Sequence, residues 1–180
     1  MKINSLIIIL IILSVSCKNN QHTAREPISH EPNKVDMTSV NNNRNLNHRE
    51  EEYIKQMIGA DTLHTYIDSG HGFWYYYIDQ NEKAKDYPQA GDKVWLQYEV
   101  RDLSNNVIYP ETKKLTYLVD RENYFRGFRE AVKLLKENEK AVFLFPSNSA
   151  YGYHGDEKEI GSNVPLKVYI NILKVEKKEE

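Results

Sequence analysis

The chain has 180 residues, with 24 basic and 26 acidic side chains and a net charge of −2. This length allows one domain of about 100–150 residues with appended segments. The sequence has no basic stripe, which argues against nucleic acid as a partner. The single cysteine excludes an intramolecular disulfide, and the scattered histidines lack the spacing of metal ligands. We therefore expect no metal and no cofactor.

Residues 1–16 have the pattern of an export signal. Lys2 precedes an apolar run from Leu6 to Leu13, far shorter than the roughly 20 residues that cross a bilayer. Cys17 follows "LSVS" and resembles the lipidated cysteine of a bacterial lipobox, although Ser14 stands where the usual pattern has Leu. The pattern predicts a protein of the cell envelope, anchored to a membrane by lipid on Cys17 and facing the periplasm. An ordinary signal peptide with an incidental cysteine is the alternative.

Residues 17–48 read as a flexible tether. The segment is rich in Asn ("VNNNRNLN"), contains Pro27 and Pro32, and has few apolar residues. Nothing in it repeats at the period of a helix or a strand, so it has little surface to bury. We expect it to hold the folded part away from the anchor.

Residues 49–70 are predicted to form a helical lead-in. Four apolar residues share one helical stripe: Tyr53, Ile54, Met57 and Ile58. The acids at 50–52 would occupy the first turn, where the helix dipole favours negative charge. Gly59 is expected to end the helix.

Residues 71–180 contain the sequence patterns of several short strands and one helix. Strand patterns cover "GFWYYYIDQ", "KVWLQYEVRDL", "VIYPETKKLTYLVD", "AVFLFP" and "LKVYINILKVE". In the second of these, one face carries Val94, Leu96, Tyr98 and Val100. The helix in "RENYFRGFREAVKLLKENEK" has a core-facing stripe of Phe128, Ala131, Val132 and Leu135. This order predicts an α+β fold, an antiparallel sheet with a helix packed on one face.

The stretch "PSNSAYGYHGDEKEIGSN", residues 146–163, is too broken for a helix or a strand, yet it carries two tyrosines. We interpret it as a lid over a hydrophobic pocket, with Tyr151 pointing inward and Ile160 forming a wall. Tyr153 can simply lie at the surface, and Tyr151 can alternatively be buried for packing alone.

The block from Gly91 to Glu176 resembles the FKBP family of peptidyl-prolyl isomerases. The matching pieces are "GDKVWLQY", "YFRGFREAVKLLKENEKAVFLFP", "AYGYHG" and "IGSNVPLKVYINILKVE", in family order. The resemblance implies a half-open antiparallel sheet wrapped around a short helix, with a pocket for proline-containing polypeptide segments between them. The lipobox-like start, tether, leading helix and "FWYYYI" strand further resemble the lipid-anchored, gliding-motility-associated isomerase lipoproteins of gliding bacteria.

The resemblance also implies a role for each residue of the pocket. The Tyr151 hydroxyl and the backbone N–H of Phe125 would donate to substrate carbonyls, and Phe128 would form the pocket floor. The remaining walls would come from Tyr98, Ile108, Tyr109, Leu115, Tyr124, Ile160 and Val168. For Tyr98 and Val168, core packing is an interpretation nearly as good as a pocket role.

The sequence departs from the family at four places. Ile108-Tyr109 replaces the usual Phe-Asp, so the acid at the pocket edge is missing, with Glu111 two residues away. Tyr124 is bulky where the family has a small residue, Leu115 replaces a Phe, and Gly161-Ser162 replaces paired prolines. Two function classes stay open: an isomerase that helps exported or envelope proteins fold, and an FKBP-fold binding or assembly module of the envelope with weak catalysis.

Overall fold

The computed structural model describes residues 37–112 and 114–179, so the predicted signal peptide, Cys17 and residues 18–36 lie outside the described residues. By its internal contacts the chain divides after Met37, and all elements from Thr38 onward belong to one compact unit. None of the helices described here is long and apolar enough to cross a membrane.

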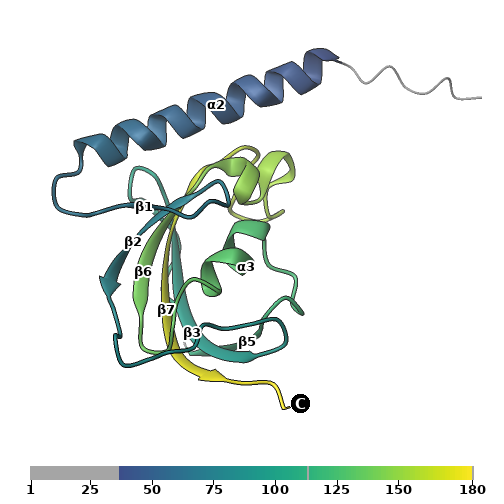
Figure 1. Ribbon diagram of the computed structural model, residues 1–180. Helices are drawn as coiled ribbons and strands as arrows, with labels where there is room; N and C mark the ends of the chain where they lie inside the picture. The colour runs from purple at the N-terminus through teal and green to yellow at the C-terminus, as the bar shows by residue number, and fades with distance from the viewer. Residues whose placement is uncertain (1–36, 113, 180) are drawn as a thin grey trace, which may run out of the picture. The chain divides into compact units, whose positions relative to one another are not determined.

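The sheet is antiparallel throughout and has seven strands. They are β1 Ile67–Asp68, β2 Trp74–Asp79, β3 Lys93–Asp102, β4 Val107–Tyr109, β5 Leu115–Leu118, β6 Lys140–Phe145 and β7 Leu166–Glu176. The order across the sheet is β1-β2-β6-β7-β3-β4, and β5 also pairs with β3. Figure 1 shows the short helix α3, Arg126–Val132, on one side of this curved sheet. The predicted fold class is confirmed.

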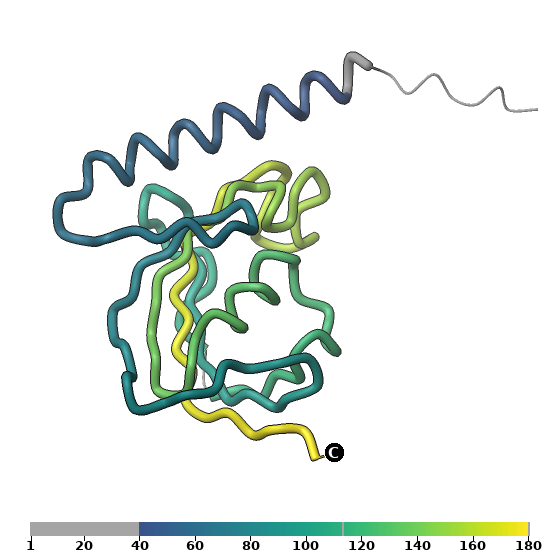
Figure 2. Tube along the Cα trace, viewed as in Figure 1, coloured from purple at the N-terminus to yellow at the C-terminus, as the bar shows by residue number. Residues whose placement is uncertain are grey.

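The centre of the sheet pairs strands that are far apart in the sequence. β3 runs along β7 from Lys93↔Glu176 to Asp102↔Leu166, and β7 also pairs with β6. Figure 2 shows these segments as neighbouring lengths of the trace. Because side chains alternate between the two faces of a strand, Val94, Leu96 and Val100 all enter the core, as predicted.

Helix α3 presents its predicted stripe to this core. Phe128, Ala131 and Val132 are buried, and Leu135 is buried just beyond the helix. The helix can lie close to β6 because residue 127 is Gly. A Cβ atom there would lie only 2.6 Å from the Phe145 ring and 2.6 Å from the carbonyl oxygen of Ser149.

Helix α2, Met37–Ala60, begins upstream of the predicted start at Arg49, so residues 37–48 are helical and do not belong to a flexible tether. Its N-terminal half packs through few apolar groups. Leu46 and Asn47 line a cavity of about 130 Å³ together with residues of the 147–163 segment. Once such contacts hold part of a helix, each added turn requires little free energy, because propagation of a helix is far more favourable than its nucleation.

The early start of α2 changes the role predicted for its acids. Glu50 lies far inside the helix, so it does not occupy a first turn, and it is buried at 8% exposure. On the predicted apolar stripe, Ile54 is fully buried, whereas Tyr53 is exposed. The face of α2 that is buried therefore contains Glu50 and Ile54, one helical turn apart.

Candidate active site

The ten predicted pocket residues all lie in the packed interior of the domain. All of them belong to the core cluster or pack against it: Tyr98 on β3, Ile108 and Tyr109 on β4, Leu115 on β5, Tyr124 and Phe125 before α3, Phe128 on α3, Tyr151 and Ile160 in the β6–β7 loop, and Val168 on β7. The β6–β7 loop comprises residues 146–165 and contains two short 3₁₀ helices, η1 Ser147–Ser149 and η2 Gly152–His154. Segments that are distant in the sequence thus contribute to one core, and three of the ten residues, Tyr98, Tyr109 and Tyr151, also line one surface hollow.

The base of the site is a stack of aromatic rings. The rings of Tyr124 and Phe128 are stacked with their centroids 4.6 Å apart, and Tyr98 meets Phe128 edge-on at 5.3 Å. Phe128 is only 1% exposed. The ring predicted as the pocket floor is thus covered by the rings of Tyr124 and Tyr98.

Next to Tyr98, the surface has a hollow of about 260 Å³. The hollow is lined by Tyr98, Tyr109, Tyr151, Asp156 and Lys158. The three tyrosines were among the predicted residues. Sequence reasoning missed Asp156 and Lys158, whose only signal was their place in the loop that follows "AYG".

Tyr151 provides a protonated hydroxyl at this hollow. It precedes η2, and its ring packs against that of Phe125 with 5.0 Å between centroids. Burial, followed by the nearby Tyr98 and Asp156, raises the pKa of Tyr151 to about 12. Its hydroxyl has no hydrogen-bond partner among residues 37–112 and 114–179, so it is available to donate to a ligand.

A second donor lies at the start of α3. Phe125 is the N-cap residue, with the extended angles φ −61° and ψ 153°, and its carbonyl accepts from the N–H of Arg129 at 3.3 Å. The N–H of Phe125 itself has no partner in the described part of the chain. A free N–H is expected at the beginning of a helix, where the first donors lack an intrahelical acceptor.

The carboxylate at the pocket edge comes from the β6–β7 loop. The hydroxyl of Tyr109 donates to Asp156, which also accepts from the backbone N–H groups of Lys158 at 3.0 Å and Ile160 at 2.8 Å. Glu111, the acid nearest in sequence, is exposed and does not line the hollow. Burial raises the pKa of Asp156, but the hydrogen bonds from Tyr109 and the two backbone groups outweigh it, so the pKa is lowered.

The rest of the loop folds back beneath this edge. Ile160 is buried at 3% exposure, and its carbonyl accepts from the N–H of Asp156 at 3.0 Å. The N–H of Asn163 donates to the carbonyl of Gly152 at 2.8 Å. Tyr153 is 69% exposed and lies at the surface, as predicted. These contacts hold the loop as a defined wall beside Tyr151.

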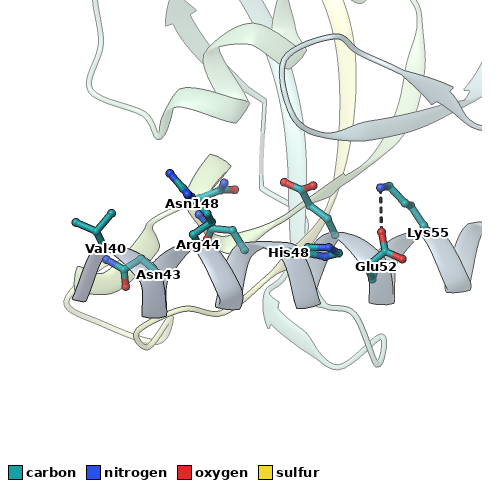
Figure 3. A pocket seen from close by; sticks show the side chains of 9 residues that line it. Val40, Asn43, Arg44, His48, Glu52, Lys55 and Asn148 are labelled. Carbon is teal, nitrogen blue, oxygen red and sulfur yellow. Dashed lines mark hydrogen bonds and ion pairs between the residues drawn. The ribbon is translucent and has the colours of Figure 1, made fainter. Parts of the chain in front are cut away.

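A larger and more open hollow of about 580 Å³ runs along α2 (Figure 3). Its lining is largely polar and charged, including Arg44, His48, Glu52 and Lys55, and it has no aromatic floor. The described residues contain no group of three or more His, Cys, Asp or Glu side chains that could hold a metal ion.

The fold class is that of an antiparallel sheet around a short helix, with an aromatic site beside the β6–β7 loop. Residues 84–173 match the model of the FKBP-type peptidyl-prolyl cis-trans isomerase family, and the chain belongs to this family.

Similar proteins agree with this assignment. The chain is 29% identical over 132 residues to a probable FKBP-type peptidyl-prolyl cis-trans isomerase FkpA of Neisseria meningitidis serogroup B. The match covers 69% of this chain and 44% of that relative, so the chain spans less than half of the relative's length.

Two solved structures share the fold. A peptidyl-prolyl cis-trans isomerase of Pseudomonas syringae pv. tomato has a TM-score of 0.56 at 18% identity, covering 78% of this chain and 96% of that one. The structure of the three FKBP domains of wheat FKBP73 has a TM-score of 0.55 at 18% identity. The match covers 62% of this chain and 48% of that one.

Proposed function

We propose that this protein is a peptidyl-prolyl cis-trans isomerase that acts on proline-containing polypeptide segments. One observation carries the proposal: the Phe125 N–H and the Tyr151 hydroxyl have no partner among the described residues, and their two rings pack together beside a hollow lined by tyrosines. Family membership supports it.

The chemistry requires no nucleophile. Rotation about an X-Pro bond has a barrier of about 18–20 kcal/mol, because resonance stiffens the C–N bond. The planar amide is charge-separated and well hydrated, whereas the twisted transition state is less so. A partly dry aromatic site therefore favours the twisted form, and lowering the barrier by about 7 kcal/mol would accelerate the rotation roughly 10⁵-fold.

Each donor has a separate task in this proposal. The Phe125 N–H holds one carbonyl of the peptide, and the protonated Tyr151 hydroxyl holds the other, so the chain on both sides of the proline is fixed while the bond turns. Tyr98 and Tyr109 line the hollow, and Ile108, Leu115, Ile160 and Val168 belong to the core of the same domain or pack against it. The Asp156 carboxylate fixes the Tyr109 hydroxyl at the rim.

A binding or assembly module is the alternative, and one observation favours it. Phe128 is covered by Tyr124, so a proline ring meets an aromatic floor only by contacting Tyr124 or by displacing it. Such a site can hold an extended peptide at its rim without accelerating isomerisation.

We further propose that the protein is lipid-anchored through Cys17 in the cell envelope, faces the periplasm and helps exported proteins fold, with a role in gliding motility. The export-signal pattern before Cys17 supports the lipid anchor and the envelope location, and the role in gliding motility rests on the resemblance to lipid-anchored isomerases of gliding bacteria. Replacing Cys17 by Ala should move the protein from the membrane fraction to the soluble fraction. Equal retention of both proteins in membranes would contradict lipid anchoring.

The isomerase proposal is tested with a protease-coupled assay on the full-length chain and a panel of X-Pro peptides. Wild-type protein should accelerate isomerisation, and Tyr151→Phe should lower kcat/KM by roughly 10- to 100-fold, because one donor to a desolvated carbonyl is lost. Tyr153→Phe is the matched control, since this tyrosine is exposed, and it should behave as wild type. Peptide binding without acceleration would establish the binding module instead.

A further inference from the structure

Helix α2 contacts the β6–β7 loop through a buried carboxylate that the site described above does not use. Glu50 accepts two hydrogen bonds from Ser147, one from the backbone N–H at 2.7 Å and one from Oγ at 2.9 Å. Glu50 is 8% exposed and Ser147 is 1% exposed. The two residues are 97 positions apart in the sequence, so this contact forms only when α2 docks on the folded domain.

Ser147 is the first residue of η1, and the residue before it is Pro146, which has no side chain that can cap the turn. The Glu50 carboxylate supplies that cap from another helix. Hydrogen bonds to an ionised carboxylate are about twice as strong as neutral ones. A buried carboxylate is costly unless its oxygens are paired, and here Ser147 satisfies both of them.

The capped turn leads directly to Tyr151. The N–H of Ala150, the residue before Tyr151, donates to the Ser147 carbonyl at 3.0 Å. The intervening Ser149 donates through Oγ to the carbonyl of Gly72 at 3.0 Å, and its own carbonyl lies against Gly127 of α3. The backbone that precedes Tyr151 is therefore held by α2, by the segment before β2 and by α3.

We propose that Glu50 is a positioning residue for Tyr151, so that α2 forms part of the catalytic unit. The inference rests on the proposed isomerase function. Loss of the carboxylate leaves the first N–H of η1 and the Ser147 hydroxyl unpaired in a buried place, and η1 shifts to reach other acceptors. A displacement of about 1 Å at a catalytic group can lower a rate about 100-fold. Because Tyr151 acts on the twisting amide, the loss falls on kcat more than on KM.

The test compares three variants of the full-length chain in the isomerisation assay. Glu50→Ala removes both acceptors and should lower kcat by about tenfold with little change in KM. Glu50→Gln can still accept from the N–H and donate to Oγ, so it should recover most of the rate. Glu52→Ala is the control on the same helix. Among the described residues the Glu52 carboxylate pairs with Lys55 at the surface (Figure 3), so this variant should match wild type.

A double-mutant cycle separates positioning from general destabilisation. If Glu50 acts through Tyr151, then Glu50→Ala should have almost no further effect on kcat in a Tyr151→Phe background. A similar fold loss in both backgrounds would overturn the inference, as would unchanged kcat in Glu50→Ala.

Amide hydrogen exchange provides a readout that does not depend on activity. In Glu50→Ala, exchange at residues 149–152 should accelerate by tenfold or more, whereas exchange in β3 and β7 should remain as in wild type. Equal acceleration in the loop and in the central strands, or none in the loop, would overturn the inference. An inactive wild-type protein whose loop still responds in this way would refute the isomerase proposal and leave the structural coupling between Glu50 and the loop intact.

Discussion

The Tyr109 hydroxyl at the end of β4 donates a hydrogen bond to the Asp156 carboxylate in the β6–β7 loop. The chain thereby recovers a carboxylate at the pocket edge, although the position usual for it in the family holds Tyr109. The contact also ties one edge of the sheet to the loop that carries Tyr151.

The lowered pKa of Asp156 predicts that the stability of the protein depends on this carboxylate in a pH-dependent way. A carboxyl whose pKa is lower in the folded state stabilises the fold fully above its unfolded value, near 3.9, and loses this contribution as the pH falls through the folded value. Asp156→Asn should therefore lower the melting temperature most above about pH 5, and the difference from wild type should shrink below about pH 4.

Glu159→Gln is the matched control for this prediction, because it removes one negative charge from the same loop at an exposed position. Its melting temperature should follow wild type across the pH range. A difference between wild type and Asp156→Asn that grows as the solution becomes more acidic would contradict the assigned sign.

Replacing Tyr124 by Val should open the aromatic base. The Tyr124 ring stacks on Phe128 at 4.6 Å, so its removal exposes Phe128 to the hollow. We expect kcat/KM for X-Pro peptides to rise by up to about tenfold, with a loss of about 1–3 kcal/mol in stability from the smaller side chain. A fall in kcat/KM while the protein remains folded would show that Tyr124 itself forms the working floor.

Phe128→Ala should lower activity and stability together. The ring is buried at 1% exposure and contacts four other aromatic rings, so its loss leaves a cavity in the core. In urea denaturation, the free energy of unfolding of Phe128→Ala should be about 3–5 kcal/mol lower than that of wild type. A loss below about 1 kcal/mol would mean that Phe128 does not belong to the packed core.

Gly127→Ala tests the close approach of α3 to β6 and the loop. The new Cβ would lie 2.6 Å from the Phe145 ring and 2.6 Å from the Ser149 carbonyl oxygen. We therefore expect the free energy of unfolding, measured by urea denaturation, to fall by about 1–3 kcal/mol. Gly59→Ala in α2 is the control: nothing lies within 4 Å of its Cβ, and Ala is the better helix former. Gly59→Ala should leave the free energy of unfolding unchanged or raise it by up to about 1 kcal/mol.

The sequence predicts those parts of the fold that follow a regular period. Alternation in β3 and the spacing of Phe128, Ala131 and Val132 identified the core faces, because burial of one face imposes that pattern. The predicted start of this helix at Arg49 was wrong by more than three turns, because α2 begins at Met37. Its upstream half is Asn-rich and largely exposed, so no apolar period marks it.

Candidate site residues could be predicted where they belong to a local sequence motif. They could not be predicted where their role depends on partners far away in the sequence. Tyr151 belongs to a recognisable "AYG" segment, whereas Asp156 is one acid among several in a polar loop. Its role depends on the loop fold that brings it to Tyr109, and the burial of Glu50 depends on how α2 docks on Ser147. Such partners are fixed by tertiary structure and leave no pattern in the neighbouring residues.

The most direct test of the account is one NMR titration of ¹⁵N-labelled full-length chain with an unlabelled X-Pro peptide. The central claim predicts that the Phe125 amide resonance shifts strongly, together with those of Tyr109, Gly152 and Asp156, while the cis and trans signals of the peptide broaden through accelerated exchange. The central claim would be contradicted if the shifts were confined to α2 residues along the larger hollow, such as Arg44 and His48, and the cis–trans exchange of the peptide were unchanged.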